Sequence, residues 1–122
     1  MSLVEVLVAL VVLSTGLLGV AQVLIHGMRT SHAALLRTQA VNLVADMAER
    51  IRANPGDVAE DDVAEWLATV RDLLPVASGD VHRFAADATD RYHVSVSWTE
   101  PGESQPLSEY ADVVLLRPAV SP

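Results

Sequence analysis

Cysteine is absent from the 122-residue chain, which excludes a disulfide bond, a thiolate zinc site and a cysteine nucleophile. Lysine is absent as well, so all eight basic residues are arginine. The sequence holds no glycine-rich phosphate loop, and its serines, histidines and acids form no recognisable catalytic set. We therefore expect neither an enzyme nor a cofactor, and no small-molecule substrate.

The histidines give little support for a metal site. His26 and His32 are six residues apart, a spacing that does not place two side chains on one face of a helix. His82 and His93 could share a metal ion only if their segments formed adjacent strands. No metal is expected.

Charge is divided unevenly along the chain. Residues 1–52 contain three acids and four arginines, a net charge of +1, whereas residues 53–122 contain 13 acids and four arginines, a net charge of −9. A field of this sign repels phosphate. No nucleic-acid partner is therefore expected for the C-terminal part.

The N-terminal segment is strongly apolar. Residues 6–25, VLVALVVLSTGLLGVAQVLI, carry no charge, and as a helix they would span ~30 Å, the thickness of a bilayer core. A cleaved signal peptide would have a basic start and a small-residue cleavage site, and residues 1–28 show neither. We predict a retained membrane-spanning helix over 1–28. Arg29 and Arg37 follow it, and the positive-inside rule applied to this chain alone would leave the C-terminal domain in the cytoplasm.

Glu5 is unusual in this setting, because a carboxylate at the edge of an apolar span is costly to desolvate. One interpretation places Glu5 in the first helical turn at the headgroup level, where the helix dipole favours an acid. The other pairs it with the α-amine of Met1, one turn away, in the same chain or in a staggered neighbouring copy. The residues leave both interpretations open.

The membrane-spanning helix is predicted to continue as one helix beyond the span, and a second helix follows it; both carry an apolar stripe at spacings of three and four. The first continues over 29–54 and ends at Asn54-Pro55-Gly56, with Asp46–Arg50 and Glu49–Arg52 pairs on its polar faces. The second covers 57–74, with Asp57 and Glu60 as a capping box and Pro75 after its end. The stripes consist of Ala33, Leu36, Ala40, Leu43, Met47 and Ile51, and of Val63, Trp66, Leu67, Val70, Leu73 and Leu74.

Antiparallel strands are predicted within 80–117. Ser78-Gly79-Asp80 is typical of a turn, and strands are expected at Val81–Ala86, Tyr92–Thr99 and Tyr110–Arg117. Trp66 and Trp98 lie on the apolar phase of their elements and are expected to anchor a core. The sequence thus predicts an α+β domain over 29–122, with its helices against one face of the sheet.

The first ten residues, MSLVEVLVAL, resemble the mature N-terminus of type IV pilins and type II secretion pseudopilins, whose usual start is Phe-Thr-Leu-Ile-Glu before an apolar helix. The segments GLLGVA at 16–21 and VADMAERIRANP at 44–55 resemble the minor pilins of the PilV group. This resemblance implies a type IV pilin-like α+β fold, in which a long N-terminal helix packs on a small domain.

For individual residues, the resemblance implies that a prepilin peptidase exposes Met1 by removing a basic leader, and that the Met1 amine is then N-methylated. Glu5 would pair with the N-terminal amine of a neighbouring subunit in the filament core. A removed leader would also put the domain in the periplasm. The chain departs from the family in three ways: Met1 replaces phenylalanine, Gln22 stands where many major pilins have proline, and the disulfide-closed loop of major pilins cannot form.

The function implied is that of a minor pilin, which is held in the bacterial inner membrane and then joins a type IV pilus or primes its assembly near the tip. Its partners would be other minor pilins and the major pilin, through bundling of N-terminal helices. The alternatives are a minor pseudopilin of a type II secretion system, a tip-located adhesin or DNA-binding module, and a plain membrane-anchored periplasmic protein.

Overall fold

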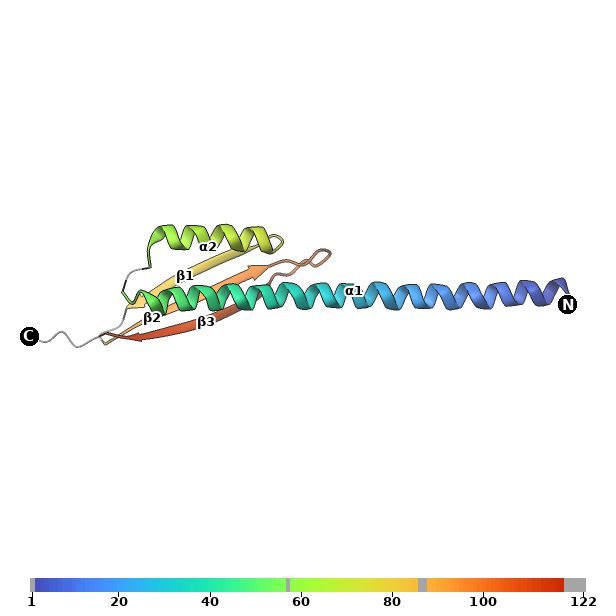
Figure 1. Ribbon diagram of the computed structural model, residues 1–122, viewed down its shortest axis with the longest axis horizontal. Helices are drawn as coiled ribbons and strands as arrows, with labels where there is room; N and C mark the ends of the chain where they lie inside the picture. The colour runs from blue at the N-terminus through green and yellow to red at the C-terminus, as the bar shows by residue number, and fades with distance from the viewer. Residues whose placement is uncertain (1, 57, 86–87, 118–122) are drawn as a thin grey trace, which may run out of the picture. The chain divides into compact units, whose positions relative to one another are not determined.

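A single uninterrupted helix, α1, covers Leu3–Ala53 in the computed structural model (Figure 1), which describes residues 2–56, 58–85 and 88–117. It ends where predicted, at a turn over Asn54–Gly56, and the Asn54 amide still donates to the Arg50 carbonyl at 3.1 Å. The chain forms two compact units, Met1–Ala34 and Leu35–Pro122, and their boundary lies within α1.

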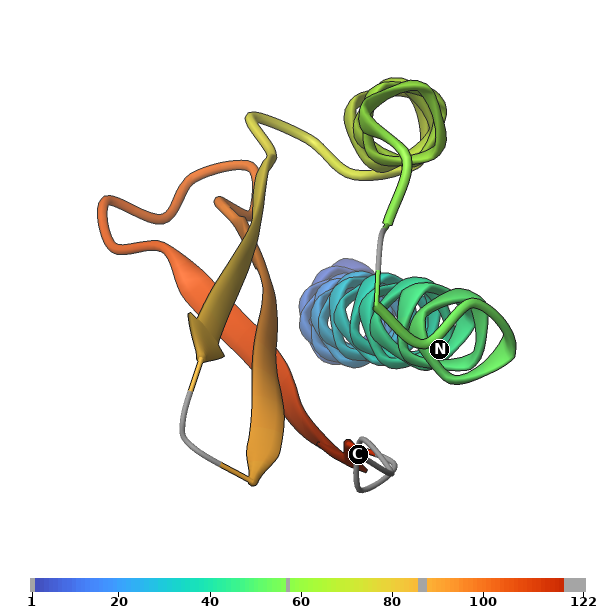
Figure 2. The ribbon, with the colours of Figure 1, turned by 90° about the vertical axis from the view of Figure 1, so that its left-hand side faces the viewer.

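The second unit has an α+β architecture, as predicted. After α1 come the helix α2, Glu60–Leu73, and the strands β1, Ser78–Ala85, β2, Thr89–Trp98, and β3, Leu107–Leu116. The strands form one antiparallel sheet in the order β1-β2-β3, with β2 at the centre. Figure 2 shows α2 and the C-terminal half of α1 on the same side of this sheet.

The core lies between these helices and the sheet. The second half of α1 supplies an apolar stripe at the predicted spacing, made of Leu36, Ala40, Leu43, Val44, Met47, Ala48 and Ile51. From β2, alternate residues Tyr92, Val94, Val96 and Trp98 are buried on the facing side. The buried side chains that recur every second residue in β2 therefore pack against those that recur every three or four residues in α1.

Trp66 ties α2 to α1. Its side chain is buried, and the indole Nε1–H donates a 2.8 Å hydrogen bond to the backbone carbonyl of Leu43. Val70 and Leu74 continue the stripe of α2 into the core, whereas Leu73, which was predicted to belong to it, is exposed. Both tryptophans thus anchor the core as predicted.

The predicted start of the second helix is wrong by three residues. α2 begins at Glu60 with Ala59 as its N-cap, and no side chain of the described residues forms a cap hydrogen bond there. Asp57, which was expected to form a capping box with Glu60, lies outside the described residues. The first turn instead contains Glu60, Asp61 and Asp62, which the positive end of the helix dipole favours.

The predicted turn at Ser78-Gly79-Asp80 is also wrong, because all three residues belong to β1. Gly79 is needed for a close approach: a Cβ atom there would lie 2.8 Å from the Trp66 ring and 2.9 Å from Leu67. The absent side chain lets α2 pack directly on β1. In sequence, this glycine cannot be told from one that forms a turn.

Gly79→Ala should therefore destabilise the second unit by about 1–3 kcal/mol, the usual cost of inserting a methyl group into a packed core. Chemical denaturation of the full chain, followed by the fluorescence of the buried tryptophans, measures this loss. Asp80→Ala, at the neighbouring exposed position, is the matched control and should stay within about 0.5 kcal/mol of the parent. Equal stability of Gly79→Ala and the parent would contradict the close packing of α2 on β1.

Candidate functional site: the N-terminal part of α1

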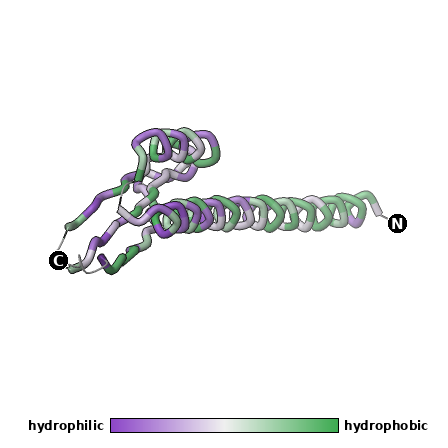
Figure 3. Tube along the Cα trace, turned by 60° about the vertical axis from the view of Figure 1, so that its left-hand side comes forward, coloured by the Kyte–Doolittle hydropathy of each residue, from purple (hydrophilic) through white to green (hydrophobic). Residues whose placement is uncertain are grey.

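The part of α1 that lies in the first unit exposes apolar residues on all sides. Every residue from 2 to 32 is exposed, and the large apolar side chains are between 44% exposed at Val6 and 79% at Leu3. Figure 3 shows this part of the helix as mainly hydrophobic, in contrast to the mixed character of its C-terminal half. By length and composition, α1 can cross a membrane. A surface of this kind needs lipid or other apolar helices to cover it.

Polar side chains inside this segment bond to the helix itself. The Ser14 hydroxyl donates to the Leu10 carbonyl at 2.7 Å, and the Thr15 hydroxyl donates to the Val11 carbonyl. Since these hydroxyls have backbone partners four residues earlier, they need none from the surroundings. The helix also continues unbroken through Gly16 and Gly19.

Glu5 takes part in a capping box at the start of α1. The Ser2 amide donates to Glu5 Oε2 at 3.1 Å, and the Glu5 amide donates to Ser2 Oγ at 3.4 Å. These reciprocal bonds satisfy two amides that the first helical turn leaves without a helical partner. The Ser-x-x-Glu pattern at residues 2–5 is the sequence signal of such a box, and our prediction placed the box at Asp57 instead.

The box gives Glu5 a defined orientation. Its Oε2 atom accepts the bond from Ser2, while Oε1 accepts no hydrogen bond from any residue in the described part of the chain. This geometry agrees with the interpretation of Glu5 as a first-turn acid. Met1 lies outside the described residues, so pairing with its amine stays a prediction.

A second polar centre closes one end of the sheet. Asp90, at the start of β2, is buried, and its carboxylate accepts hydrogen bonds from Arg117 at 2.6 and 3.2 Å and from Arg83 at 3.0 Å. Arg83 also donates to the carbonyl of Gly56 at 3.5 Å. This group, which we call the Asp90 clamp, joins β1, β2, the residue after β3 and the turn after α1.

The two arginines of the clamp stabilise the ionised carboxylate. Hydrogen bonds from Arg117, followed by those from Arg83 and the charges of both, outweigh burial and lower the pKa of Asp90 from 3.8 to about 2. Our sequence reasoning missed all three residues, because only the strand register brings them together. The sequence offers one indication of the clamp, because Asp90 is an acid at a position that continues the alternation of buried apolar residues in β2.

The histidines do not form a metal centre in residues 2–56, 58–85 and 88–117, where no suitable group of three ligands occurs. His82 and His93 do lie directly opposite each other on β1 and β2. However, His93 Nδ1 lies 2.7 Å from Asp112 Oδ1, so this histidine pairs with a carboxylate of β3.

Comparison with protein families gives a match to part of the chain. The family model described as "Tt1218-like: Type IV pilin Tt1218" matches residues 23–71. The chain is similar to type IV pilins. The match covers less than half of the chain, from the middle of α1 to the end of α2, and leaves out Glu5. No curated protein and no solved structure gave a significant match.

The type IV pilin match and the fold point to a structural subunit rather than an enzyme. They support a pilin-like subunit that associates with a membrane and assembles with other pilins. The matched residues include 44–55, which carry part of the resemblance described above, but not the first ten residues, which resemble the N-terminus of type IV pilins. Assignment to the PilV group stays a prediction.

The Asp90 clamp predicts a pH-dependent stability. Because folding lowers the pKa of Asp90, its contribution is complete above the unfolded value near 3.8 and disappears as the pH falls toward about 2. Asp90→Asn should therefore lower the denaturation midpoint at neutral pH, and this deficit should shrink below pH ~4. Asp46→Asn, which removes an exposed helical pair with Arg50, should have little effect at any pH. A deficit in Asp90→Asn that does not change with pH would contradict the ionic role.

Proposed function

We propose that this protein is a minor pilin, stored in the bacterial inner membrane with its C-terminal domain in the periplasm and then built into a type IV pilus. The observation that carries the proposal is a helix that is apolar on all sides and begins with an oriented carboxylate at Glu5. A simple membrane anchor requires the apolar surface alone. The carboxylate adds a group that can set the position of one helix against another.

The pairing partner in this proposal is the Met1 amine of a neighbouring subunit. An unpaired carboxylate among packed apolar helices is strongly disfavoured, whereas a carboxylate paired with an amine is tolerated. Each residue advances a helix by ~1.5 Å, so a slip of even one turn, ~5.4 Å, would separate the two charges. The pair would thereby select one axial register among many that apolar packing alone permits.

Ser2 would act as a positioning residue in this mechanism. Its amide holds Glu5 Oε2, which leaves Oε1 without a partner in the described part of the chain and open to the incoming amine. The box also provides hydrogen-bond acceptors for two backbone amides that would otherwise lack partners in an apolar surrounding. The same two hydrogen bonds thus satisfy the amides at the start of the helix in the membrane and orient Glu5 for pairing in the filament.

The pairing is tested by Glu5→Ala in the native host. The variant should insert into the inner membrane normally but appear in sheared pili at about a tenth of the parent level or less, because one ion pair of ~1.4 kcal/mol corresponds to a tenfold change. Immunoblots of the membrane and pilus fractions, with pili counted by microscopy, measure both quantities. Glu5→Asp keeps the charge and should retain part of the incorporation.

Two results would count against this role of Glu5. Normal incorporation of Glu5→Ala would show that the carboxylate does not set the register. Loss of the variant from the membrane fraction would show that Glu5 acts before assembly. Glu5→Gln keeps the shape of the side chain and separates the effect of charge from that of size.

Modification of the N-terminus gives a separate test of membership in the pilus. Mass spectrometry of the protein isolated from the native host should find residue 1 as methionine with a methylated α-amine. An unprocessed or formylated residue 1 would instead identify a membrane-anchored protein outside the pilus pathway.

A further inference from the structure

The face of the sheet that points away from the helices carries aromatic, basic and aliphatic side chains that have no part in the bundling of N-terminal helices. The register of the strands puts Phe84 opposite Arg91 and Arg91 opposite Val114, so that these three side chains form one row across the sheet. The face is uncovered in the second unit, where Phe84 is 52% exposed and Val114 54% exposed. An aromatic ring, a guanidinium group and an aliphatic side chain therefore lie side by side.

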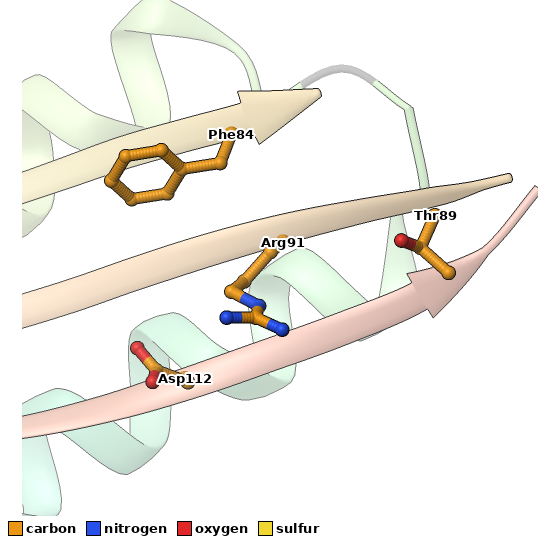
Figure 4. A pocket seen from close by; sticks show the side chains of 4 residues that line it. All are labelled: Phe84, Thr89, Arg91 and Asp112. Atoms are coloured by element: carbon orange, nitrogen blue, oxygen red, sulfur yellow. The ribbon is translucent and has the colours of Figure 1, made fainter. Parts of the chain in front are cut away.

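This row borders a hollow. A pocket of about 370 Å³ is lined by Phe84, Thr89, Arg91 and Asp112, and Figure 4 shows the Arg91 side chain lying between Phe84 and Asp112. The Phe84 ring meets the His82 ring edge-on, with their centroids 4.5 Å apart. The apolar wall of the hollow therefore contacts a neighbouring aromatic side chain.

Arg91 provides the positive charge of this hollow. Arg37, Arg50, Arg52, Arg83 and Arg117 each form an ion pair with an acid of the same chain. Arg29, Arg71 and Arg91 form no ion pair or hydrogen bond with the described residues, although the chain has twice as many acids as arginines, and of these three Arg91 lines the hollow. The acid among the lining residues, Asp112, pairs with His93, whose Nδ1 lies 2.7 Å from Asp112 Oδ1. A guanidinium beside apolar surface and without a partner is suited to bind an anion with an apolar neighbour.

We propose that this surface, which we call the Arg91 face, binds an acidic and apolar peptide segment of a partner protein. The carboxylate of the segment would bind Arg91, and its apolar side chain would cover Phe84 and Val114. In an extended peptide, residues i and i+2 point to the same side at a separation of ~6.5–7 Å, which exceeds the ~4.5–5.5 Å between directly opposed residues of a sheet by a difference that the long Arg91 side chain can span. The segment therefore carries its acidic and apolar residues two positions apart.

A peptide fits this surface better than the other charged macromolecules. Nucleic acid presents repeated phosphates to a domain with a net charge of −9, and one arginine cannot offset that repulsion. A peptide segment presents one carboxylate together with apolar surface, which matches one guanidinium next to Phe84 and Val114. The proposal does not depend on Glu5, because residues 84–114 take no part in the pairing of N-terminal helices.

The test uses the isotope-labelled full chain in detergent micelles and the probe peptide acetyl-Glu-Ala-Leu-amide, followed by changes in amide NMR signals. At about 10 mM peptide, which detects millimolar dissociation constants, signals of residues 84, 89, 91 and 114 should shift. The matched peptide acetyl-Gln-Ala-Leu-amide should bind at least about tenfold more weakly, the effect of losing ~1.4 kcal/mol. Arg91→Gln should remove the difference between the two peptides, whereas Arg71→Gln, on an exposed position of α2, should preserve it.

Several outcomes would overturn the assignment. Equal binding of the two peptides, or unchanged binding by Arg91→Gln, would show that Arg91 does not recognise the carboxylate. Acetate binding as tightly as the peptide would identify a simple anion site. Concentration-dependent shifts of the same signals without any peptide would identify a second copy of this chain as the occupant. Unchanged signals elsewhere in Arg91→Gln confirm that the variant is folded, so a loss of binding is not a loss of structure.

Discussion

The apolar stripe on the second half of α1 is the contact on which the second unit depends. A helix of 14 residues is marginal in water by itself, and a small sheet with one apolar face gains stability by packing that face against a helix. The stripe from Leu36 to Ile51 gives both a surface to cover. The bond from Trp66 to the Leu43 carbonyl then fixes α2 along α1, and Gly79 lets β1 approach the same indole ring. The helix α2 and the sheet are thereby both positioned by one face of α1.

The same helix has a different character before residue 35. There the apolar residues surround the axis, and no part of the first unit covers them. Such a surface is stable in lipid and equally stable among similar helices, since neither environment supplies water. The function we propose rests on this equivalence, because one helix can serve both as a membrane anchor and as the core of a filament. Glu5 is the group that distinguishes the two environments.

Arginine has a distinct use in this acidic, cysteine-free chain. Arg83 and Arg117 close the end of the sheet around Asp90, where a covalent link between cysteines is impossible. The clamp joins segments that are far apart in sequence, as a disulfide would, but its strength depends on pH and not on redox conditions. Arg91, one position further along β2, points to the opposite face and is left for an external partner. Alternation along one strand thus separates a stabilising charge from a recognition charge.

Local periodicity was enough to predict α1, its buried stripe, its C-terminal end near Ala53 and the α+β class. These features depend on residues three or four positions apart, which the sequence displays directly. The capping box of Ser2 and Glu5 likewise depends on residues three positions apart, and the sequence displays its Ser-x-x-Glu pattern directly. Burial of both tryptophans also followed from their phase on α2 and β2.

The tertiary structure decided what depends on distant residues. Gly79 belongs to a strand because Trp66 lies above it, and nothing near residue 79 in the sequence records that contact. Arg83, Asp90 and Arg117 form a clamp, and Phe84, Arg91 and Val114 form a row, because a particular register aligns three strands. A shift of that register by one residue would turn each side chain to the other face and separate both groups. The sequence by itself determined which surfaces are apolar, whereas pairing of the strands determined which charges meet.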